Sequence, residues 1–183
     1  MDTDVEVVEA LDLFLNEEAF MGFETDQYIT TGIMAASKEH EFIQKLLNVY
    51  KERHFVKCDG SLDITTNVKI ITNMALQYGL VRNNVQQSIC GVTFFPCDYF
   101  CPKSRVDGVV YSTTNTVCIH HFNGSWLSEE VLQEEAKRQA YIRRFGKRLG
   151  SFLYKLSKYA LHPVRILYRI TKGIEVKEYA KYD

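Results

Sequence analysis

The 183-residue chain contains little of what marks disordered or membrane-spanning proteins. It has only three prolines and no low-complexity run, which argues against a disordered chain. No apolar stretch approaches the roughly 20 residues that cross a bilayer, so the sequence predicts no transmembrane helix. The first residues, MDTDVEVVEA, lack the basic and apolar regions of a signal peptide. Five cysteines, an odd number, are typical of reduced thiols rather than of a disulfide framework.

Acidic residues are missing from one long stretch, and the net charge of −1 hides this. Residues 1–135 contain 9 Lys and Arg against 20 Asp and Glu, whereas residues 136–172 contain 11 Lys and Arg and no acid. Such asymmetry indicates two surfaces with different partners. We therefore predict two parts, residues 1–127 and a basic helical extension over residues 128–183.

The first part has the pattern of an α/β fold. Short β-rich runs bounded by turn residues predict strands, and the spacing of apolar residues predicts two helices, one with Ser37 as its N-cap. The strands are expected at Asp2–Val8, Ala19–Glu24, Gln27–Ala36, Val92–Phe95, Val109–Tyr111 and Thr116–Phe122, and the helices after Ser37 and at Val68–Leu80.

Two carboxylates separated by one residue, Asp2 and Asp4, stand at one end of the first predicted strand. If the chain turns between them, both can reach one divalent cation, and hard oxygen ligands suit Mg²⁺ or Mn²⁺. Such cations often bridge to substrate phosphates. The Asp-x-Asp pattern also arises by chance, and the alternative is a solvated acidic terminus.

A second motif is the segment CIHHFNGSW. Adjacent histidines on a strand point to opposite faces, so at most one of His120 and His121 faces a given site. A neutral imidazole can ligate a metal, and Gly124 lets the backbone approach a phosphate closely. The Ser125 hydroxyl and the Trp126 indole N–H are donors that a diphosphate can use. The alternative is a plain strand with one buried histidine and a core tryptophan.

Together the two motifs resemble glycosyltransferase family 32, which contains bacterial capsular and exopolysaccharide transferases and fungal α-1,6-mannosyltransferase relatives. The resemblance covers most of residues 1–127, and the order and spacing of its blocks make it more specific than either motif alone. The blocks are MDTDVEV, FMGFE, YITTGIMAASKEHEFI, TTNVKIIT, FFPCDYFCPKS and TNTVCIHHFNGSWLS.

The resemblance implies a GT-A fold, retaining sugar transfer from a nucleotide-sugar donor, and Mn²⁺ or Mg²⁺ held by the Asp-x-Asp pair. In this family the nucleotide-binding βαβ units precede that pair, whereas here it begins at position 2. We therefore expect residues 1–127 to be the C-terminal portion of a GT-A catalytic domain that lacks its N-terminal nucleotide-binding half. Activity is then expected to need the missing half.

The resemblance also implies the metal ligands. Asp2 would lie nearer the ribose and sugar of the donor, and Asp4 would bind the metal directly. In related GT-A enzymes a late histidine, followed three residues later by a glycine, completes the metal site. His121 and Gly124 have that spacing, so the implied set is Asp2, Asp4 and His121, with His121 preferred over His120.

The remaining roles concern the donor and the acceptor. Gly124, Ser125 and Trp126 would contact the donor diphosphate. Glu24 and Thr31 are candidates for the sugar and acceptor pocket and, with the Asp-x-Asp pair, for catalysis. For Glu24 the alternative is a charged residue that simply ends a strand.

Four cysteines and one histidine raise the alternative of a zinc site. A structural zinc site usually shows two pairs of closely spaced ligands, and only Cys97 and Cys101 form even a loose pair. We therefore interpret the cysteines as small core hydrophobes. The residues concerned are Cys90, Cys97, Cys101, Cys118 and His120.

In the basic extension, apolar residues recur every three or four positions from Ile142 to Ala160, which predicts one amphipathic helix. The segment VRILYRITK, after Pro163, repeats the pattern. Two interpretations stay open: a helix packed on the catalytic domain with a solvated basic face, or an interfacial helix on anionic lipid.

The sequence thus predicts a partial hexosyltransferase of bacterial capsular polysaccharide synthesis, located at the cytoplasmic face of a membrane. Its expected partners are a nucleotide sugar, a polysaccharide or lipid-linked acceptor and an anionic membrane surface. Nucleic acid is not expected, because the body is acidic and carries no recognised nucleic-acid motif. The alternative is a catalytically inactive remnant that binds a membrane or a protein partner through its basic helices.

Overall fold

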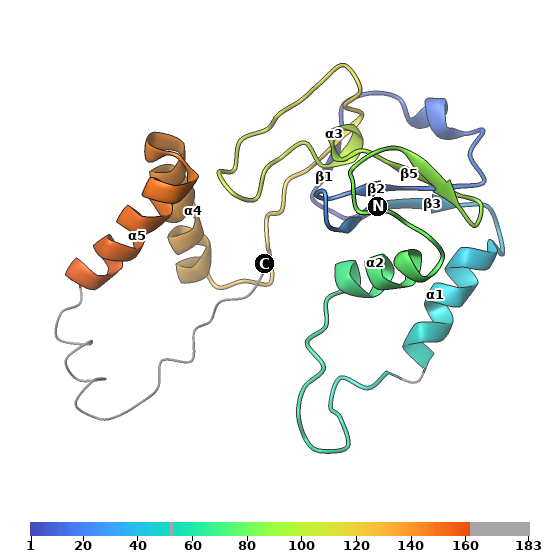
Figure 1. Ribbon diagram of the computed structural model, residues 1–183, viewed down its shortest axis with the longest axis horizontal. Helices are drawn as coiled ribbons and strands as arrows, with labels where there is room; N and C mark the ends of the chain where they lie inside the picture. Colours follow the sequence, from blue (N-terminus) through green and yellow to red (C-terminus); the bar gives the residue numbers. More distant parts are fainter. Residues whose placement is uncertain (52, 162–183) are drawn as a thin grey trace. The chain divides into compact units, whose positions relative to one another are not determined.

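The structure, a computed structural model, describes residues 1–51 and 53–161 (Figure 1). The described chain forms two compact units, one of residues 1–105 with 109–123, and one of residues 106–108 with 124–161. The first unit mixes strands and helices, which confirms the predicted α/β class. The predicted basic segment VRILYRITK lies outside the described residues.

A four-stranded sheet with strand order β3-β2-β5-β4 is the frame of the first unit. The central strand β2 (Ala19–Phe23) pairs antiparallel with β3 (Ile29–Ala36) and parallel with β5 (Val92–Phe95). The strand β4 (Gln87–Ile89) pairs antiparallel with β5. Every residue of β2 and β5 is buried, because both faces of these two strands are covered.

A separate two-stranded sheet joins the beginning and the end of the first unit. β1 (Val5–Val7) pairs antiparallel with β6 (Cys118–His120), with Val5 opposite His120. Cys118 and His120 are buried and the residue between them is half-buried, as alternation along a strand requires. The predicted strand at Val109–Tyr111 is reduced to one isolated bridge between Lys103 and Val110.

Two hydrophobic clusters cover the two faces of the larger sheet. One face packs on α1 (Glu41–Lys51) and α2 (Asn67–Gln77), which lie on the same side of the strands in Figure 1. The other face packs on the 3₁₀ helix η1 (Leu11–Phe14) and on the single turn α3 (Cys97–Phe100). Phenylalanine rings dominate this second cluster, namely Phe14, Phe20, Phe95 and Phe100.

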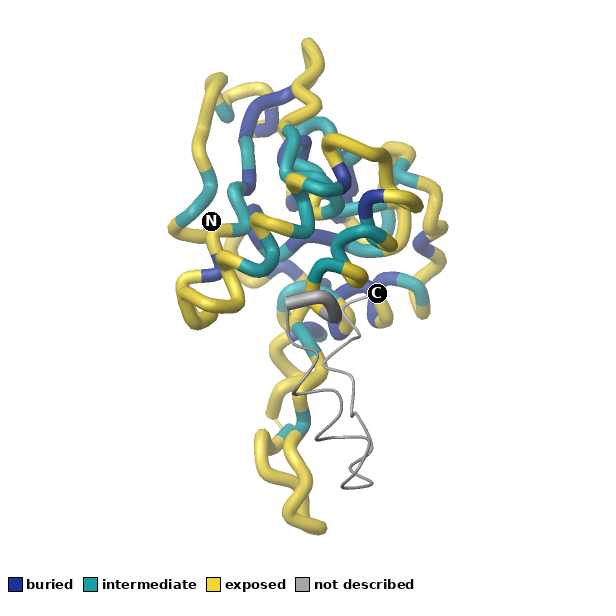
Figure 2. The backbone as a smooth tube through the Cα atoms, turned by 90° about the vertical axis from the view of Figure 1, so that its left-hand side faces the viewer, coloured by how far each residue is buried: buried dark blue, intermediate teal, exposed yellow. Residues whose placement is uncertain are grey.

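The start of α1 differs from the expectation that Ser37 caps this helix. The helix begins at Glu41, because the Ser37 amide donates to the carbonyl of Glu18 and so extends the strand edge. The connection from α1 to α2 is a long exposed loop, as Figure 2 shows. An ion pair between Arg53 and Asp63 holds its two sides together.

The second unit contains an antiparallel pair of helices, α4 (Glu129–Phe145) and α5 (Lys147–Leu161). The prediction of one continuous helix is therefore wrong. Gly146 adopts φ 77°, a left-handed value that ends α4 and that glycine accepts without strain. None of the helices in the described ranges combines the length and the apolar character needed to cross a membrane.

Close contact between the two helices depends on Gly150. A Cβ atom at this position would lie 2.4 Å from the carbonyl oxygen of Tyr141, so only glycine lets the backbones approach this closely. Further along the pair, the Tyr154 hydroxyl donates to Glu134 at 2.9 Å, and Lys137 and Lys158 lie 3.2 and 3.1 Å from the same carboxylate. The hydrogen bonds from Tyr154 and then from the two lysines lower the pKa of Glu134 to about 2.

The substitution Gly22→Ala is expected to destabilise the first unit. A Cβ atom at Gly22 would lie 2.6 Å from Cδ2 of Phe100, a ring that is only 1% exposed. Overpacking of this kind costs about 1–3 kcal/mol in free energy of unfolding. Urea denaturation measures the loss, and a double-mutant cycle with Phe100→Leu should give losses that do not add. An unchanged free energy of unfolding would contradict the packing described.

Glu134→Gln is expected to destabilise the helix pair in a pH-dependent way. The folded-state pKa of Glu134, about 2, is below its ordinary value of 4.5, so its stabilisation is present above pH 4.5 and is lost as the pH falls toward 2. The difference in Tm between wild type and Glu134→Gln should therefore shrink over that range. Glu130→Gln is the control, since Glu130 contacts no cation in the described part of the chain. A Tm difference independent of pH would argue against the ion-pair network.

Candidate metal centre

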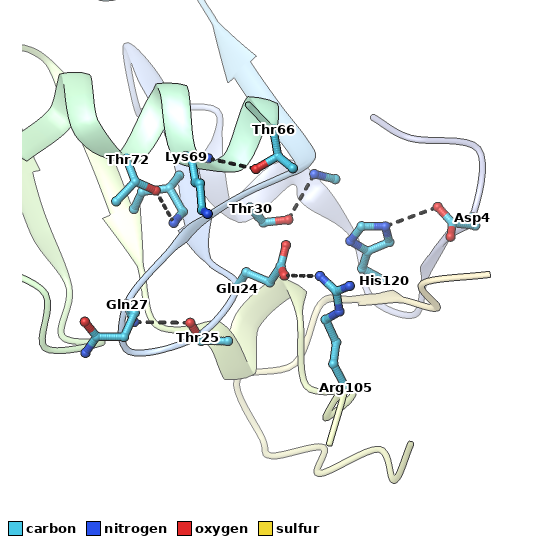
Figure 3. Close-up of polar contacts among 12 residues, drawn as sticks. Asp4, Glu24, Thr25, Gln27, Thr30, Thr66, Lys69, Thr72, Arg105 and His120 are labelled. Atoms are coloured by element: carbon cyan, nitrogen blue, oxygen red, sulfur yellow. Dashed lines mark hydrogen bonds and ion pairs between the residues drawn. The ribbon is translucent and has the colours of Figure 1, made fainter. Parts of the chain in front are cut away.

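Asp2, Asp4 and His120 converge where β1 pairs with β6. One ligand atom from each residue lies within 4.8 Å of the other two. Figure 3 shows the contact between Asp4 and His120, in which Oδ1 lies 3.2 Å from Nε2. The side chains of Asp4 and His120 are 15% and 10% exposed, whereas Asp2 is exposed. Two carboxylates and one imidazole therefore face the same small volume.

Backbone hydrogen bonds hold the Asp-x-Asp turn in place. The Asp2 amide donates to the carbonyl of Gly32 at 2.7 Å, and the Thr3 amide donates to Oδ1 of Asp2 at 2.8 Å. The Asn123 amide donates to Oδ2 of Asp4 at 2.8 Å. Both carboxylates thus accept a backbone N–H, and the chain turns between them, which is the condition that the sequence motif required.

A bulge in β3 lies against the ring of His120. Met21 pairs with Met34 but Phe23 pairs with Ile29, so the extra residues bulge out of β3. Within the bulge the Gly32 amide donates to the hydroxyl of Thr30 at 3.0 Å. A Cβ atom at Gly32 would lie 2.7 Å from Nδ1 of His120, so the absence of a side chain there leaves room for the ring.

The structure brings His120, rather than His121, to the aspartates. The register of β1 against β6 turns residues 118 and 120 inward, and His121 falls on the other side. Its Nε2 lies 2.8 Å from Oε2 of Glu6, at the surface. The preference for His121 is therefore corrected to His120, because strand register outweighs the spacing to Gly124 on which that preference rested.

His120 has one nitrogen without a partner. Its ring is buried, and Nδ1 has no hydrogen-bond partner among the residues that the structure describes. Buried polar atoms are almost always paired, so an unpaired one calls for an explanation. The other ring nitrogen, Nε2, faces Oδ1 of Asp4 at 3.2 Å, and together with a carboxylate oxygen of Asp2 these atoms lie within 4.8 Å of one another. The donor set thus fits a divalent cation.

Phe122 connects this group to a second pair of charges. Its ring centroid lies 4.1 Å from that of His120, and the guanidinium of Arg105 lies 5.3 Å from the same ring. Nη1 of Arg105 donates to Oε1 of Glu24 at 3.0 Å, and the Glu24 side chain is only 7% exposed (Figure 3). Phe122 also adopts φ 53°, a left-handed conformation that costs a bulky residue of order 1–3 kcal/mol and that is common in functional sites.

The other predicted site residues have different surroundings. Thr31 is half-buried within the β3 bulge, next to Thr30. Gly124, Ser125 and Trp126 belong to the second unit, so their contact with a diphosphate stays a prediction. Trp126 is 80% exposed, which contradicts the alternative of a core tryptophan.

The cysteines lie outside the candidate ligand group. All five are free, and the one ligand group found among the described residues contains no thiol. Burial raises the pKa of the Cys101 thiol to about 12, so this side chain remains protonated and packs as a small apolar group beside Thr30. The zinc alternative therefore has no support in this part of the chain.

Sequence reasoning missed the contributions of Arg105 and Phe122. Arg105 stands in a loop with no spacing signal, and only the fold brings it to Glu24. Phe122 follows the paired histidines and could have been singled out from the motif, but nothing in its residue type indicates a left-handed backbone.

No protein-family model, curated protein or solved structure matches this chain.

Gly32→Ala is expected to weaken metal binding without removing a ligand. The added methyl group would displace the His120 ring, and disturbing the support of a metal ligand costs about 10- to 100-fold in affinity. Titration of Mn²⁺ followed by electron paramagnetic resonance measures this loss. Gly22→Ala is the matched control, since it adds the same methyl group to the neighbouring strand against Phe100. Equal affinities for Gly32→Ala and wild type would contradict the placement of His120.

Proposed function

We propose that residues 1–127 form part of the catalytic domain of a metal-dependent, retaining glycosyltransferase of the family-32 type, with a GT-A fold. It transfers a sugar from a nucleotide-sugar donor to a polysaccharide or lipid-linked acceptor. The convergence of Asp2, Asp4 and His120 carries the proposal. A solvated acidic terminus, which is the alternative, would leave both aspartates in water, whereas Asp4 is mostly buried and accepts a backbone N–H.

The three side chains suit Mn²⁺ better than Mg²⁺. Carboxylate oxygens suit both ions, but Mg²⁺ demands near-ideal octahedral oxygen geometry, while an imidazole ligand is typical of transition metals. Asp2, Asp4 and Nε2 of His120 would hold the ion. When bound, such a cation supplies positive charge to a diphosphate leaving group, an effect worth several kcal/mol in transition-state stabilisation.

The neighbouring ion pair supports a role in binding the donor sugar. Glu24 is a buried carboxylate, and burial of a charge is tolerated when a cation with good geometry compensates it. Arg105, whose side chain is 53% exposed, supplies that cation and orients the Glu24 carboxylate. Its planar guanidinium also suits recognition of a phosphate. Phe122 packs against both Arg105 and His120, so it holds the charged pair and the metal ligands in one fixed arrangement.

Substitution of the ligands tests the metal site. Asp4→Asn and His120→Ala are each expected to weaken Mn²⁺ binding at least about tenfold, because loss of a direct ligand costs no less than loss of its support. His121→Ala is the matched control, since it removes an adjacent imidazole that contacts Glu6 instead. The measurement is again Mn²⁺ titration by electron paramagnetic resonance. Equal losses for His120→Ala and His121→Ala would refute the assigned ligand set.

The same variants test sugar transfer. We expect Mn²⁺-dependent release of nucleotide from a panel of nucleotide sugars, measured with the chain alone and with the nucleotide-binding half of a family-32 enzyme added. Asp4→Asn and His120→Ala should abolish the release and His121→Ala should retain it. If Mn²⁺ binds as expected but no nucleotide is released under either condition, the chain is a metal-binding remnant and the proposed transfer is wrong.

A further inference from the structure

The helix pair of the second unit separates its acidic residues from many of its basic ones. Glu134 forms ion pairs with Lys137 and Lys158, and Glu135 forms one with Arg138. All acids of α4 lie before residue 136, and α5 contains none. The acids therefore neutralise cations at the end of the pair where α4 begins.

Toward the turn at Gly146 and along α5, several cations lie away from these acids, although Lys158 pairs with Glu134. Four of them have no acidic partner in the described part of the chain, namely Arg144, Lys147, Arg148 and Lys155. Like charges held close together repel, so this arrangement lowers the stability of the free protein unless an anionic partner is bound. The charge thus indicates an anionic surface as the partner.

An apolar row lies on the side of α5 that faces away from α4. Leu149, Phe152 and Leu156 are spaced by three and four residues and are 52%, 57% and 47% exposed. Gly150 and Tyr154 form the opposite side of α5, where it packs on α4. Three large apolar side chains in one row, each about half exposed, need a partner that is itself apolar.

Arg148 and Lys155 border this apolar row. They are seven residues apart, which is close to two helical turns, so they lie on the same side of the helix. Arg148 is next to Leu149 at one end of the row, and Lys155 is next to Leu156 at the other. A helix with an apolar face and basic residues along its edge has the pattern of helices that lie in the plane of a membrane surface.

We propose that this face of α5 binds the surface of a bilayer that contains anionic phospholipids. Leu149, Phe152 and Leu156 enter the boundary between headgroups and acyl chains, while Arg148 and Lys155 contact lipid phosphates. A nucleic acid would satisfy the cations but leave the leucines in water, and an acidic protein surface would leave the whole row without apolar contact. Only an anionic bilayer complements both features. This inference does not depend on the proposed sugar transfer.

Vesicle flotation with the full chain tests the proposal. Vesicles of pure phosphatidylcholine and vesicles of equal parts phosphatidylcholine and phosphatidylglycerol are compared. We expect binding to the anionic vesicles only. The double variant Arg148→Gln, Lys155→Gln should lower the partition coefficient by about tenfold or more, since each basic residue near an anionic surface contributes about fivefold.

Matched variants separate this surface from general electrostatics. Lys137→Gln, Arg138→Gln removes the same charge from residues already paired with Glu134 and Glu135, and it should bind the anionic vesicles nearly as wild type does. Phe152→Gln, Leu156→Gln keeps every charge but should reduce binding about tenfold or more, because the buried apolar area is lost. Circular dichroism at the working temperature confirms that each variant is folded.

Three results would overturn the proposal. Equal weakening by the two charge-removing variants would mean that net charge alone attracts the vesicles. Retained binding by Phe152→Gln, Leu156→Gln, together with a lowered Tm, would mean that the row is covered by the chain itself. Binding of a single-stranded RNA oligomer in place of anionic vesicles would make the surface a nucleic-acid site.

Discussion

The register in which β1 pairs with β6 joins residues from opposite ends of the first unit. Val5 lies opposite His120, and the Asn123 amide binds the Asp4 carboxylate across 119 positions of sequence. If the register shifted by one residue, every side chain on β6 would change face, and His121 would replace His120 beside the aspartates. The candidate metal centre, its connection to Phe122 and its contact with the β3 bulge therefore all follow from this short strand pair.

In both units, a neighbouring group fills the space that a side chain would need at a glycine position. Phe100 occupies the space where Gly22 would carry a side chain, the His120 ring occupies that of Gly32, and the backbone of α4 occupies that of Gly150. Protein interiors are packed densely enough that a single methyl group matters. Gly22 therefore lets a core ring approach, Gly32 lets a candidate metal ligand approach, and Gly150 lets a helix backbone approach.

Much of the local structure could be predicted because it depends on residues close together in the sequence. Short runs of β-forming residues bounded by turn residues predicted β2, β3 and β5, and the apolar spacing predicted α2 within a few residues. The errors arose where long-range contacts decided the outcome. Ser37 stays with the strand because its amide binds Glu18, and α5 turns back on α4 because Gly146 and Gly150 allow it. The apolar repeat from Ile142 to Ala160 continues across that turn, so its spacing could not reveal the break.

By itself the sequence determined the chemistry that is available: two carboxylates separated by one residue, two adjacent histidines, and a stretch of basic residues without acids. Residue type and short spacing are enough for that, since they need no knowledge of distant contacts. Only the tertiary structure decided which histidine meets the aspartates, which arginine compensates Glu24, and which cations of the helix pair are left without acidic partners in the described residues. Those outcomes depend on strand register and helix packing, which bring together atoms that the sequence places far apart.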